Sequence, residues 1–327
     1  LPGAVPIVDV TRNGVDVVHI APPSAGGISR NQYEQFNVGP SGLILNNSAQ
    51  QSATVLGGSI NGNPRLGPQP ARIILNEVIS AMPSSLRGII EVAGSRADLI
   101  VANPNGIQCD GCGFLNAGRA TLAAGSPRMR NDDSVHGFDI EQGRLGVGVS
   151  GLDARGLQQL DLLARGIVIE GAVQAERIHA VAGANQVSYR DMKVQGGARN
   201  GAQGQAPRFA IDISELGGMH AQQIYLLATE QGLGVNSRGR LAALGSLQLS
   251  SAGDLRHSGV LEAGVQLVLK APLVDNHSEA VLRSQGDLRI DGALRNVGGK
   301  VCAGGDIGIT GQVSNENADL RVERQAS

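Results

Sequence analysis

The chain has 327 residues, a formal net charge of −2, 47 glycines and no tryptophan, and aromatic residues make up 2% of it. A compact enzyme of this size normally buries several aromatic side chains, so this composition favours an elongated fold with a core of Val, Ile, Leu and Ala. The sequence shows no basic cluster, which argues against nucleic-acid binding, and no apolar run reaches the ~18 residues that span a bilayer.

The first 80 residues contain short strand-like segments at 14–20, 42–48 and 71–80. The third could also form a short helix, but Ile73 and Ile74 are β-branched and the run is brief, so we favour a strand. The opening, LPGAVPIVDV, lacks the charged start and apolar core of a signal peptide. The chain is therefore either cytosolic or has already lost its signal.

Two Asn-Pro tetrads follow, NPRL at 63–66 and NPNG at 103–106. Proline fixes φ at the second position of a turn, and Asn-Gly readily adopts left-handed conformations. Strand-like segments flank the second tetrad. Taken alone, the second tetrad indicates a structural turn between two strands.

The middle of the chain, 131–245, continues the alternating aliphatic pattern with looser spacing. A Gly- and Gln-rich stretch near 190–207 is expected to leave the main structure as a loop or hairpin. Asp132 and Asp133 lie in a polar stretch that predicts a solvated loop.

The C-terminal segment, 246–327, repeats about every 20 residues. Each repeat starts with Gly, continues with two alternating aliphatic residues and places a polar residue in register. Those polar residues are His257, Asn276, Asn296 and Asn315. Strand alternation at this period predicts the stacked coils of a β-helix. The asparagines either form a ladder of amide hydrogen bonds or occupy left-handed corners. The last coil shows no polar cap, so we expect a longer protein to continue beyond it.

NPNGI, preceded by ADLIVA and followed by GFLNAGRATLAAG, resembles the secretion (TPS) domain of two-partner-secretion exoproteins, the filamentous-haemagglutinin-like family. NQYEQFNV at 31–38, GLILNNS at 42–48 and NPRL at 63–66 agree with it. The resemblance covers roughly residues 5–130, and the later coils resemble the haemagglutinin repeats of the family.

The resemblance implies an all-β fold: a right-handed parallel β-helix with an N-terminal cap and extra-helical strands or hairpins. We expect a secretion-domain core at 1–130, further coils at 131–245 and haemagglutinin-type repeats at 246–327. The family implies a monomer that is secreted or displayed by a Gram-negative bacterium, with a signal peptide upstream of Leu1. In the periplasm it would meet an outer-membrane β-barrel transporter with POTRA domains, cross it unfolded and nucleate β-helix folding at the cell surface.

The motif positions carried over from the family are the expected recognition residues. They are Asn63, Pro64, Arg65, Leu66, Asn103, Pro104, Asn105, Gly106 and Ile107. Arg65 departs from the NPNL pattern of the family and leaves no amide at that position.

Cys109 and Cys112 form a CxxC motif, and Cys302 is distant from it. A structural zinc site needs four ligands, and the histidines show no paired spacing that would complete one. A redox centre would need a feature that lowers a thiol pKa, such as a helix N-terminus. In the oxidising periplasm that the resemblance implies, we expect a Cys109–Cys112 disulfide and a free, buried Cys302. CDGCGFLN is similar to the branch that includes contact-dependent growth-inhibition proteins and haemolysins.

We therefore expect a transport-recognition domain that is not an enzyme and needs no cofactor or metal. The whole protein would be a growth-inhibition toxin or an adhesin that reaches a target cell through its C-terminal part, with a haemolysin as the alternative. A β-helix carbohydrate enzyme would need several carboxylates clustered in a groove, and Asp132-Asp133 is the one adjacent acidic pair.

Overall fold

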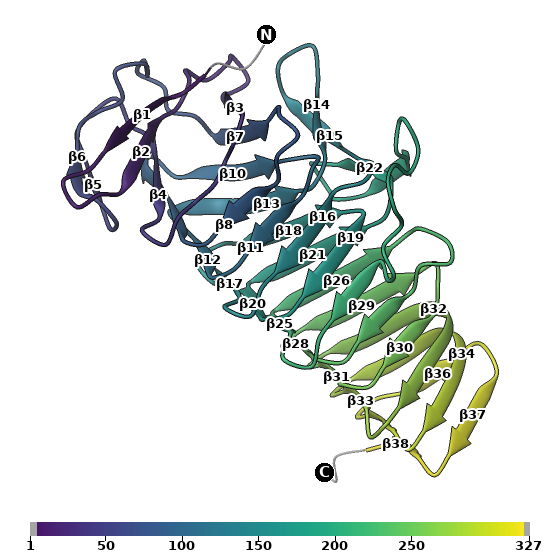
Figure 1. Ribbon diagram of the computed structural model, residues 1–327. Helices are drawn as coiled ribbons and strands as arrows, with labels where there is room; N and C mark the ends of the chain where they lie inside the picture. The colour runs from purple at the N-terminus through teal and green to yellow at the C-terminus, as the bar shows by residue number, and fades with distance from the viewer. Residues whose placement is uncertain (1–4, 324–327) are drawn as a thin grey trace.

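The computed structural model describes residues 5–323, which form an all-β parallel β-helix (Figure 1). Successive coils stack in parallel register, and most coils contribute one strand to each of three faces. This confirms the predicted fold class. The outer ends of the predicted segments, residues 1 and 327, lie outside the described residues.

The three faces are defined by their stacked strands. The first face contains β2 (Asp16–His19), β4 (Leu43–Asn47), β9 (Ile89–Gly94), β12 (Cys112–Leu115), β17 (Leu152–Ala154), β20 (Ala172–Ala175), β25 (Gly218–Ala221), β28 (Arg240–Ala243), β31 (Val260–Ala263), β33 (Val281–Ser284), β35 (Lys300–Ala303) and β38 (Asp319–Val322). The second face contains β3 (Ile28–Tyr33), β7 (Ile73–Val78), β10 (Ala97–Ala102), β13 (Ala117–Ala123), β18 (Gln159–Ala164), β21 (Arg177–Ala182), β26 (Gln223–Ala228), β29 (Ser246–Ser251) and β36 (Ile307–Ile309). The third face contains β8 (Ser84–Leu86), β11 (Ile107–Cys109), β16 (Arg144–Val147), β19 (Gly166–Ile169), β24 (Ile211–Ile213), β27 (Val235–Ser237), β30 (Leu255–His257) and β37 (Val313–Glu316). The long strands β32 (Gln266–His277) and β34 (Asp287–Val297) pass through the corner and belong to both the second and the third face.

Strand alternation places like residues above one another in the core. Leu247 stacks on Leu267 and Leu267 on Leu288, and the neighbouring column runs through Leu249 and Leu269. These leucines are buried, and each contributes about 2 kcal/mol through removal of its apolar surface from water. The predicted alternation in the repeats is therefore confirmed.

The in-register asparagines form the predicted ladder. Asn276 donates an amide hydrogen bond to Asn296 Oδ1 (2.7 Å), and Asn296 donates one to Asn315 Oδ1 (2.7 Å). None of these three asparagines has a positive φ, so the alternative of left-handed corners is wrong for them. His257 pairs in register with Asn276 but does not continue the ladder. Its ring nitrogens instead face the carbonyl oxygens of Ser237 (3.1 Å) and Val281 (3.2 Å).

We expect His257 to make stability depend on pH. Burial lowers the pKa of its imidazole to about 4 from 6.5. As the pH falls below about 6.5, the unfolded chain takes up this proton first, so stability declines until the pH reaches about 4. The loss is about 3 kcal/mol, and urea unfolding between pH 7 and pH 4 measures it.

The matched variant for this prediction is His257→Asn. An amide at this position can donate to Asn276 Oδ1, which is buried and has no hydrogen-bond partner. The variant should lose stability less steeply over the same pH range than the parent chain. Equal slopes for the two proteins would contradict a role for His257.

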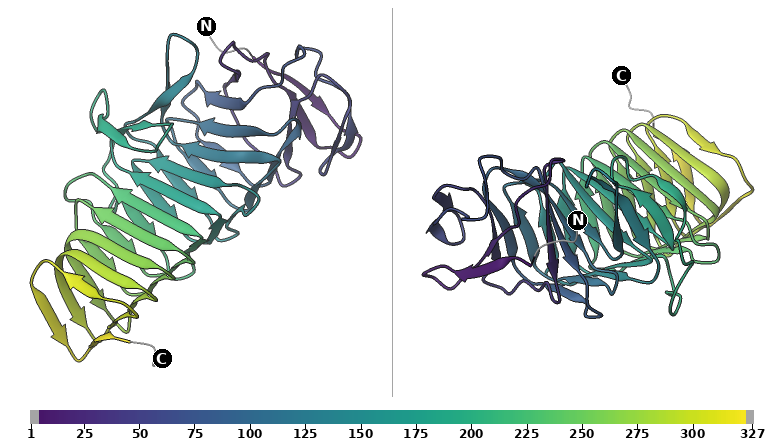
Figure 2. Two further views of the ribbon diagram at one scale, coloured as in Figure 1. Left: turned by 180° about the vertical axis from the view of Figure 1, so that it is seen from behind. Right: turned by 90° about the horizontal axis from the view of Figure 1, so that it is seen from above.

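Two excursions leave the β-helix at the corner between the second and the third face. They supply β14 (Ser126–Met129), β15 (Val135–Ile140), β22 (Asn185–Ser188) and β23 (Val194–Gly197), which form an antiparallel sheet. This extra-helical sheet lies against the N-terminal half of the molecule (Figures 1 and 2). Its Phe138 and Val187 pack on the outer side of the second face, against Ile100, Leu163 and Val181.

The N-terminal coils carry two further antiparallel pairs. β1 (Ile7–Val10) pairs with β2, and β5 (Ser52–Thr54) pairs with β6 (Gly58–Ile60). The strands predicted at 14–20, 42–48 and 71–80 correspond to β2, β4 and β7, so the helical alternative for 71–80 is wrong. The described residues contain no helix that is long and apolar enough to cross a membrane.

Candidate functional site

The NPNGI turn joins β10 to β11 at the corner between the second and the third face. Gly106 N donates to Asn103 O (3.1 Å) and closes a four-residue turn with Pro104 at its second position. Gly106 has a φ of 112°, whereas Asn105 does not have a positive φ. The sequence predicted left-handed conformations for the Asn-Gly pair, and only Gly106 of the two adopts one. Ile107 starts β11 and is buried.

The Asn103 side chain ties this turn to the preceding coil. It is 0% exposed, and its amide donates to Met82 O (2.9 Å) and Ser84 Oγ (2.9 Å). Its Oδ1 accepts a bond from Asn105 N (3.0 Å). Asn105 Nδ2 donates to Ser80 O (2.7 Å), so both asparagines hold the loop that precedes β8.

The NPRL turn repeats this geometry at a different corner. Leu66 N donates to Asn63 O (3.2 Å), and Arg65 N donates to Asn63 Oδ1 (2.9 Å). The Asn63 amide donates to Ile20 O (2.9 Å) and to Asn46 O (3.1 Å), which connects the first two coils.

The four NPRL residues differ in burial. Asn63 is 1% exposed and Leu66 packs in the core, whereas Pro64 is exposed. The Arg65 guanidinium donates to Val5 O (2.9 Å). The fold therefore uses the two Asn-Pro turns in the same way but does not bring them together.

Four further asparagines were not assigned a role from the sequence. Asn31, Asn46, Asn47 and Asn76 are all 0% exposed. Asn47 donates to Ala71 O and Ser95 O and accepts from Ala71 N, which fixes two loops to one strand. The available signal was an Asn inside an aliphatic strand segment, as in GLILNNS and ARIILNEV. A buried amide there must find partners, because an unpaired one costs about 1–3 kcal/mol.

The predicted disulfide between Cys109 and Cys112 is present, at the corner between the third and the first face. Gly111 has a φ of 80° and lets the chain turn between the two cysteines. Cys302 is free and buried, as expected.

A buried charged cluster lies on the outer side of the second face. Asp161, on β18, is 0% exposed and accepts bonds from Arg119 Nε (2.5 Å) and Thr121 Oγ1 (2.8 Å). Burial alone would raise the pKa of the Asp161 carboxyl, but His179, Arg119 and Gln159 favour the charged form and lower it.

Arg119 also links the β-helix to the extra-helical sheet. Its Nη2 donates to Tyr189 O (2.8 Å), and its guanidinium lies 4.2 Å from the centre of the Tyr189 ring. Tyr189 OH approaches Asp98 Oδ2 at 3.4 Å, and burial raises the pKa of the Asp98 carboxyl. This cluster therefore fastens the chain segment after β22 to the second face.

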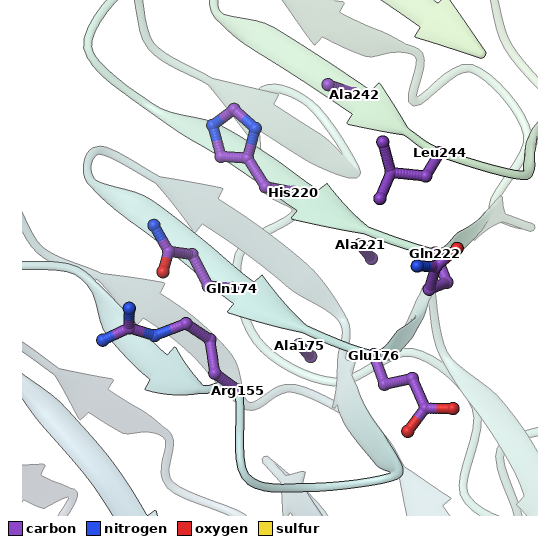
Figure 3. Close-up of a pocket in the computed structure, with 9 residues that line it drawn as sticks. All are labelled: Arg155, Gln174, Ala175, Glu176, His220, Ala221, Gln222, Ala242 and Leu244. Atoms are coloured by element: carbon purple, nitrogen blue, oxygen red, sulfur yellow. The ribbon is translucent and has the colours of Figure 1, made fainter. Parts of the chain in front are cut away.

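Four surface concavities lie within residues 5–323, and none of them brings together the two carboxyl groups of a glycosidase. The groove in Figure 3 has a volume of about 480 Å³ on the first face, and Glu176 is the single carboxylate among the residues lining it. Glu176 lies at the end of β20, away from His220. Three other concavities contain one carboxylate each, from Asp254, Glu170 and Glu323. Asp132, of the Asp132-Asp133 pair, is exposed at the tip of the β14–β15 hairpin. Within residues 5–323 no group of three or more His, Cys, Asp or Glu is placed to hold a metal ion.

Residues 2–257 match the TPS secretion domain family. The chain belongs to this family. It is 44% identical over 256 residues to the tRNA nuclease CdiA-2 of Burkholderia pseudomallei, which covers 78% of this chain and 8% of that protein. It is 37% identical over 346 residues to the tRNA nuclease CdiA of Yersinia mollaretii, which covers 97% of this chain and 11% of that protein. The filamentous hemagglutinin secretion domain superposes with a TM-score of 0.76 at 32% identity, covering 95% of this chain and all of that one.

These comparisons confirm the resemblance and the function of the domain. The chain is the secretion domain of a CdiA-like exoprotein, a class that is exported across the outer membrane of Gram-negative bacteria. A TpsB transporter is the kind of partner that recognises such a domain. The chain spans about a tenth of the length of these CdiA relatives, and the word nuclease in their names describes the longer proteins.

Proposed function

We propose that the transporter recognises this chain through its two Asn-Pro motifs before the chain has folded. The observation that carries the proposal is the burial of the first asparagine in each motif: Asn63 is 1% exposed and Asn103 is 0% exposed. A side chain without exposed surface cannot contact a partner. The transporter therefore contacts these amides while the chain is unfolded. After folding, the same amides hold turns of the β-helix.

The partner in this proposal carries POTRA domains on the periplasmic side of its barrel. The monomeric chain reaches it after removal of a signal peptide and presents extended segments that pair with exposed strand edges. Residues 64–66 and 104–107 flank the two asparagines and complete the recognition motifs.

Folding then proceeds outward from the N-terminal coils at the cell surface. The core at 1–130 folds first, the coils at 131–245 add to it, and the repeats at 246–327 follow. Each new coil buries aliphatic side chains such as Leu247 and Leu249 on the coil before it. At about 2 kcal/mol per buried leucine, coil addition favours outward movement of the chain.

The whole protein is proposed to be a contact-dependent growth-inhibition toxin or an adhesin that meets its target cell through the part beyond this domain. The names of the similar CdiA proteins favour the toxin. A haemolysin remains the alternative within the same branch.

Secretion of the chain from cells with and without a co-expressed cognate transporter tests the proposal. The signal peptide is restored, and Asn103→Ala is compared with Asn47→Ala. Both asparagines are fully buried and each donates two bonds, and the Oδ1 of each accepts a bond from a backbone N–H. Asn103 Oδ1 also accepts one from Asn105 Nδ2 (3.2 Å). Asn47 lies outside the Asn-Pro motifs. We expect transporter-dependent release that falls at least about tenfold with Asn103→Ala and less with Asn47→Ala. Equal loss in the two variants, in proportion to their lost stability, would show that the motif acts through folding alone.

A further inference from the structure

One surface depression combines an accessible aromatic ring with two unpaired guanidinium groups. It has a volume of about 280 Å³ and lies at the edge of the third face, where the Gly- and Gln-rich excursion returns to β24. Its lining residues are Arg208, Phe209, Gly232, Gly234, Asp254 and Arg256. Arg208 Cζ lies 5.4 Å and Arg256 Cζ 5.9 Å from the centre of the Phe209 ring.

Phe209 differs from the other phenylalanines in its accessibility. Phe36, Phe114 and Phe138 are buried, whereas Phe209 is half-buried and keeps part of its ring at the surface. Gly232 leaves open space beside it, whereas Gly234 lets the backbone of Asp254 approach closely where a side chain would otherwise lie. Gly232 has a φ of 79°, which disfavours any other residue at that position.

The two arginines lack the carboxylate partners that Arg238 and Arg295 have on the same face. The guanidinium groups of Arg208 and Arg256 form no ion pair or hydrogen bond with the residues that the structure describes. Asp275 is the strand neighbour of Arg256, yet the guanidinium that lies near Asp275 is that of Arg295 (3.7 Å). The Arg256 guanidinium lies near Phe209 instead.

We propose that this depression binds an acidic sugar, meaning a hydroxylated ring that carries a carboxylate or a phosphate. The guanidinium groups suit the anionic group, since arginine binds carboxylates and phosphates through paired hydrogen bonds. The part of the Phe209 ring that stays accessible suits the apolar face of a sugar ring. The Asp254 carboxylate accepts hydrogen bonds from hydroxyl groups.

A nucleic acid is disfavoured as the ligand by the same residues. Asp254 would repel a continuous phosphate backbone, and the net charge of the chain is −2. The site is formed by the folded β-helix, so its use does not depend on the transporter.

Calorimetric titration of the whole chain with digalacturonic acid and with glucose 6-phosphate tests the proposal. We expect a dissociation constant of about 1 mM for at least one of them, because a depression of about 280 Å³ is smaller than a typical ligand pocket of roughly 300–1,000 Å³. Binding of digalacturonic acid would identify a carboxylate as the preferred anionic group, and binding of glucose 6-phosphate would identify a phosphate. The neutral galactose disaccharide should bind at least tenfold more weakly.

Variants of the two arginines show whether this depression is the binding site. Arg208→Ala combined with Arg256→Ala should weaken binding at least tenfold, and Phe209→Leu should weaken it several-fold. The control Arg295→Ala, which removes a paired arginine two strands away, should leave binding unchanged. The proposal is overturned by no binding of either acidic sugar, by equal binding of inorganic phosphate alone, by tighter binding of oligothymidylate, or by an equal effect of Arg295→Ala.

Discussion

Replacing Asn103 by alanine is expected to destabilise the domain by about 3 kcal/mol. The variant loses both amide donors and leaves Met82 O, Ser84 Oγ and Asn105 N without this partner at a fully buried position. Each unsatisfied buried group costs about 1–3 kcal/mol, and partial relaxation of the turn limits the sum. Urea unfolding followed by circular dichroism measures the change in the free energy of unfolding.

Asn105→Ala is the matched control for this experiment. Its amide donates to Ser80 O and its side chain is half-buried, so water can replace much of what is lost. We expect a loss below about 1 kcal/mol. A loss for Asn103→Ala as small as this would contradict the assignment of Asn103 as the main tie between the NPNGI turn and the preceding coil.

The fold could be predicted from the sequence where neighbours in space are also one period apart. The residues that pair between β29, β32 and β34 lie 20 or 21 positions apart in sequence. Their aliphatic alternation and the asparagine ladder are therefore visible as a repeat. His257 shows the limit of this reasoning, because its register was predictable but its bonds to two carbonyl oxygens were not.

The extra-helical sheet could not be predicted in the same way. The residues that pair between β15 and β22 lie 45 to 51 positions apart in sequence, and no repeat links the two segments. The sequence does contain one indirect signal. ADLIVA in β10 and LDLLA in β18 are nearly continuous apolar runs, as expected for parallel strands that are covered on both sides. Such runs imply that a second layer covers the outer side of these strands, and the extra-helical sheet is that layer.

The two turns of the candidate site could be predicted from the sequence, but the long-range hydrogen bonds of their side chains could not. The Asn-Pro tetrads indicate turns because proline and asparagine restrict the backbone locally. Which carbonyls their amides reach depends on coil register, so the bonds from Asn103 to Met82 and Ser84 required the structure. Arg119 lies 42 residues from Asp161 and 70 from Tyr189, and nothing in the sequence spacing joins them.

Replacing Arg119 by alanine is expected to destabilise the domain by about 3–5 kcal/mol, the second large effect. The change leaves the Asp161 carboxylate, which is 0% exposed, without its guanidinium partner, and a buried charge that loses its partner is strongly destabilising. It also removes the bond to Tyr189 O that holds the extra-helical sheet. Hydrogen exchange should therefore accelerate first in β22 and β23 and only later in the leucine columns of the repeats.

Two comparisons separate this buried-charge effect from a loss of packing. Without Arg119, the pKa of the Asp161 carboxyl should be higher than in the parent chain, so the stability deficit of the variant should shrink as the pH falls and the carboxyl takes up a proton. Asp161→Asn in the Arg119→Ala background removes the charge and should recover part of the stability at neutral pH.

The control Arg155→Ala breaks an exposed ion pair with Asp153. The two side chains are 71% and 54% exposed, so the variant should change stability by less than about 1 kcal/mol. If the double variant were no more stable than Arg119→Ala at any pH, Arg119 would act through its packing on Tyr189 and not through the charge of Asp161.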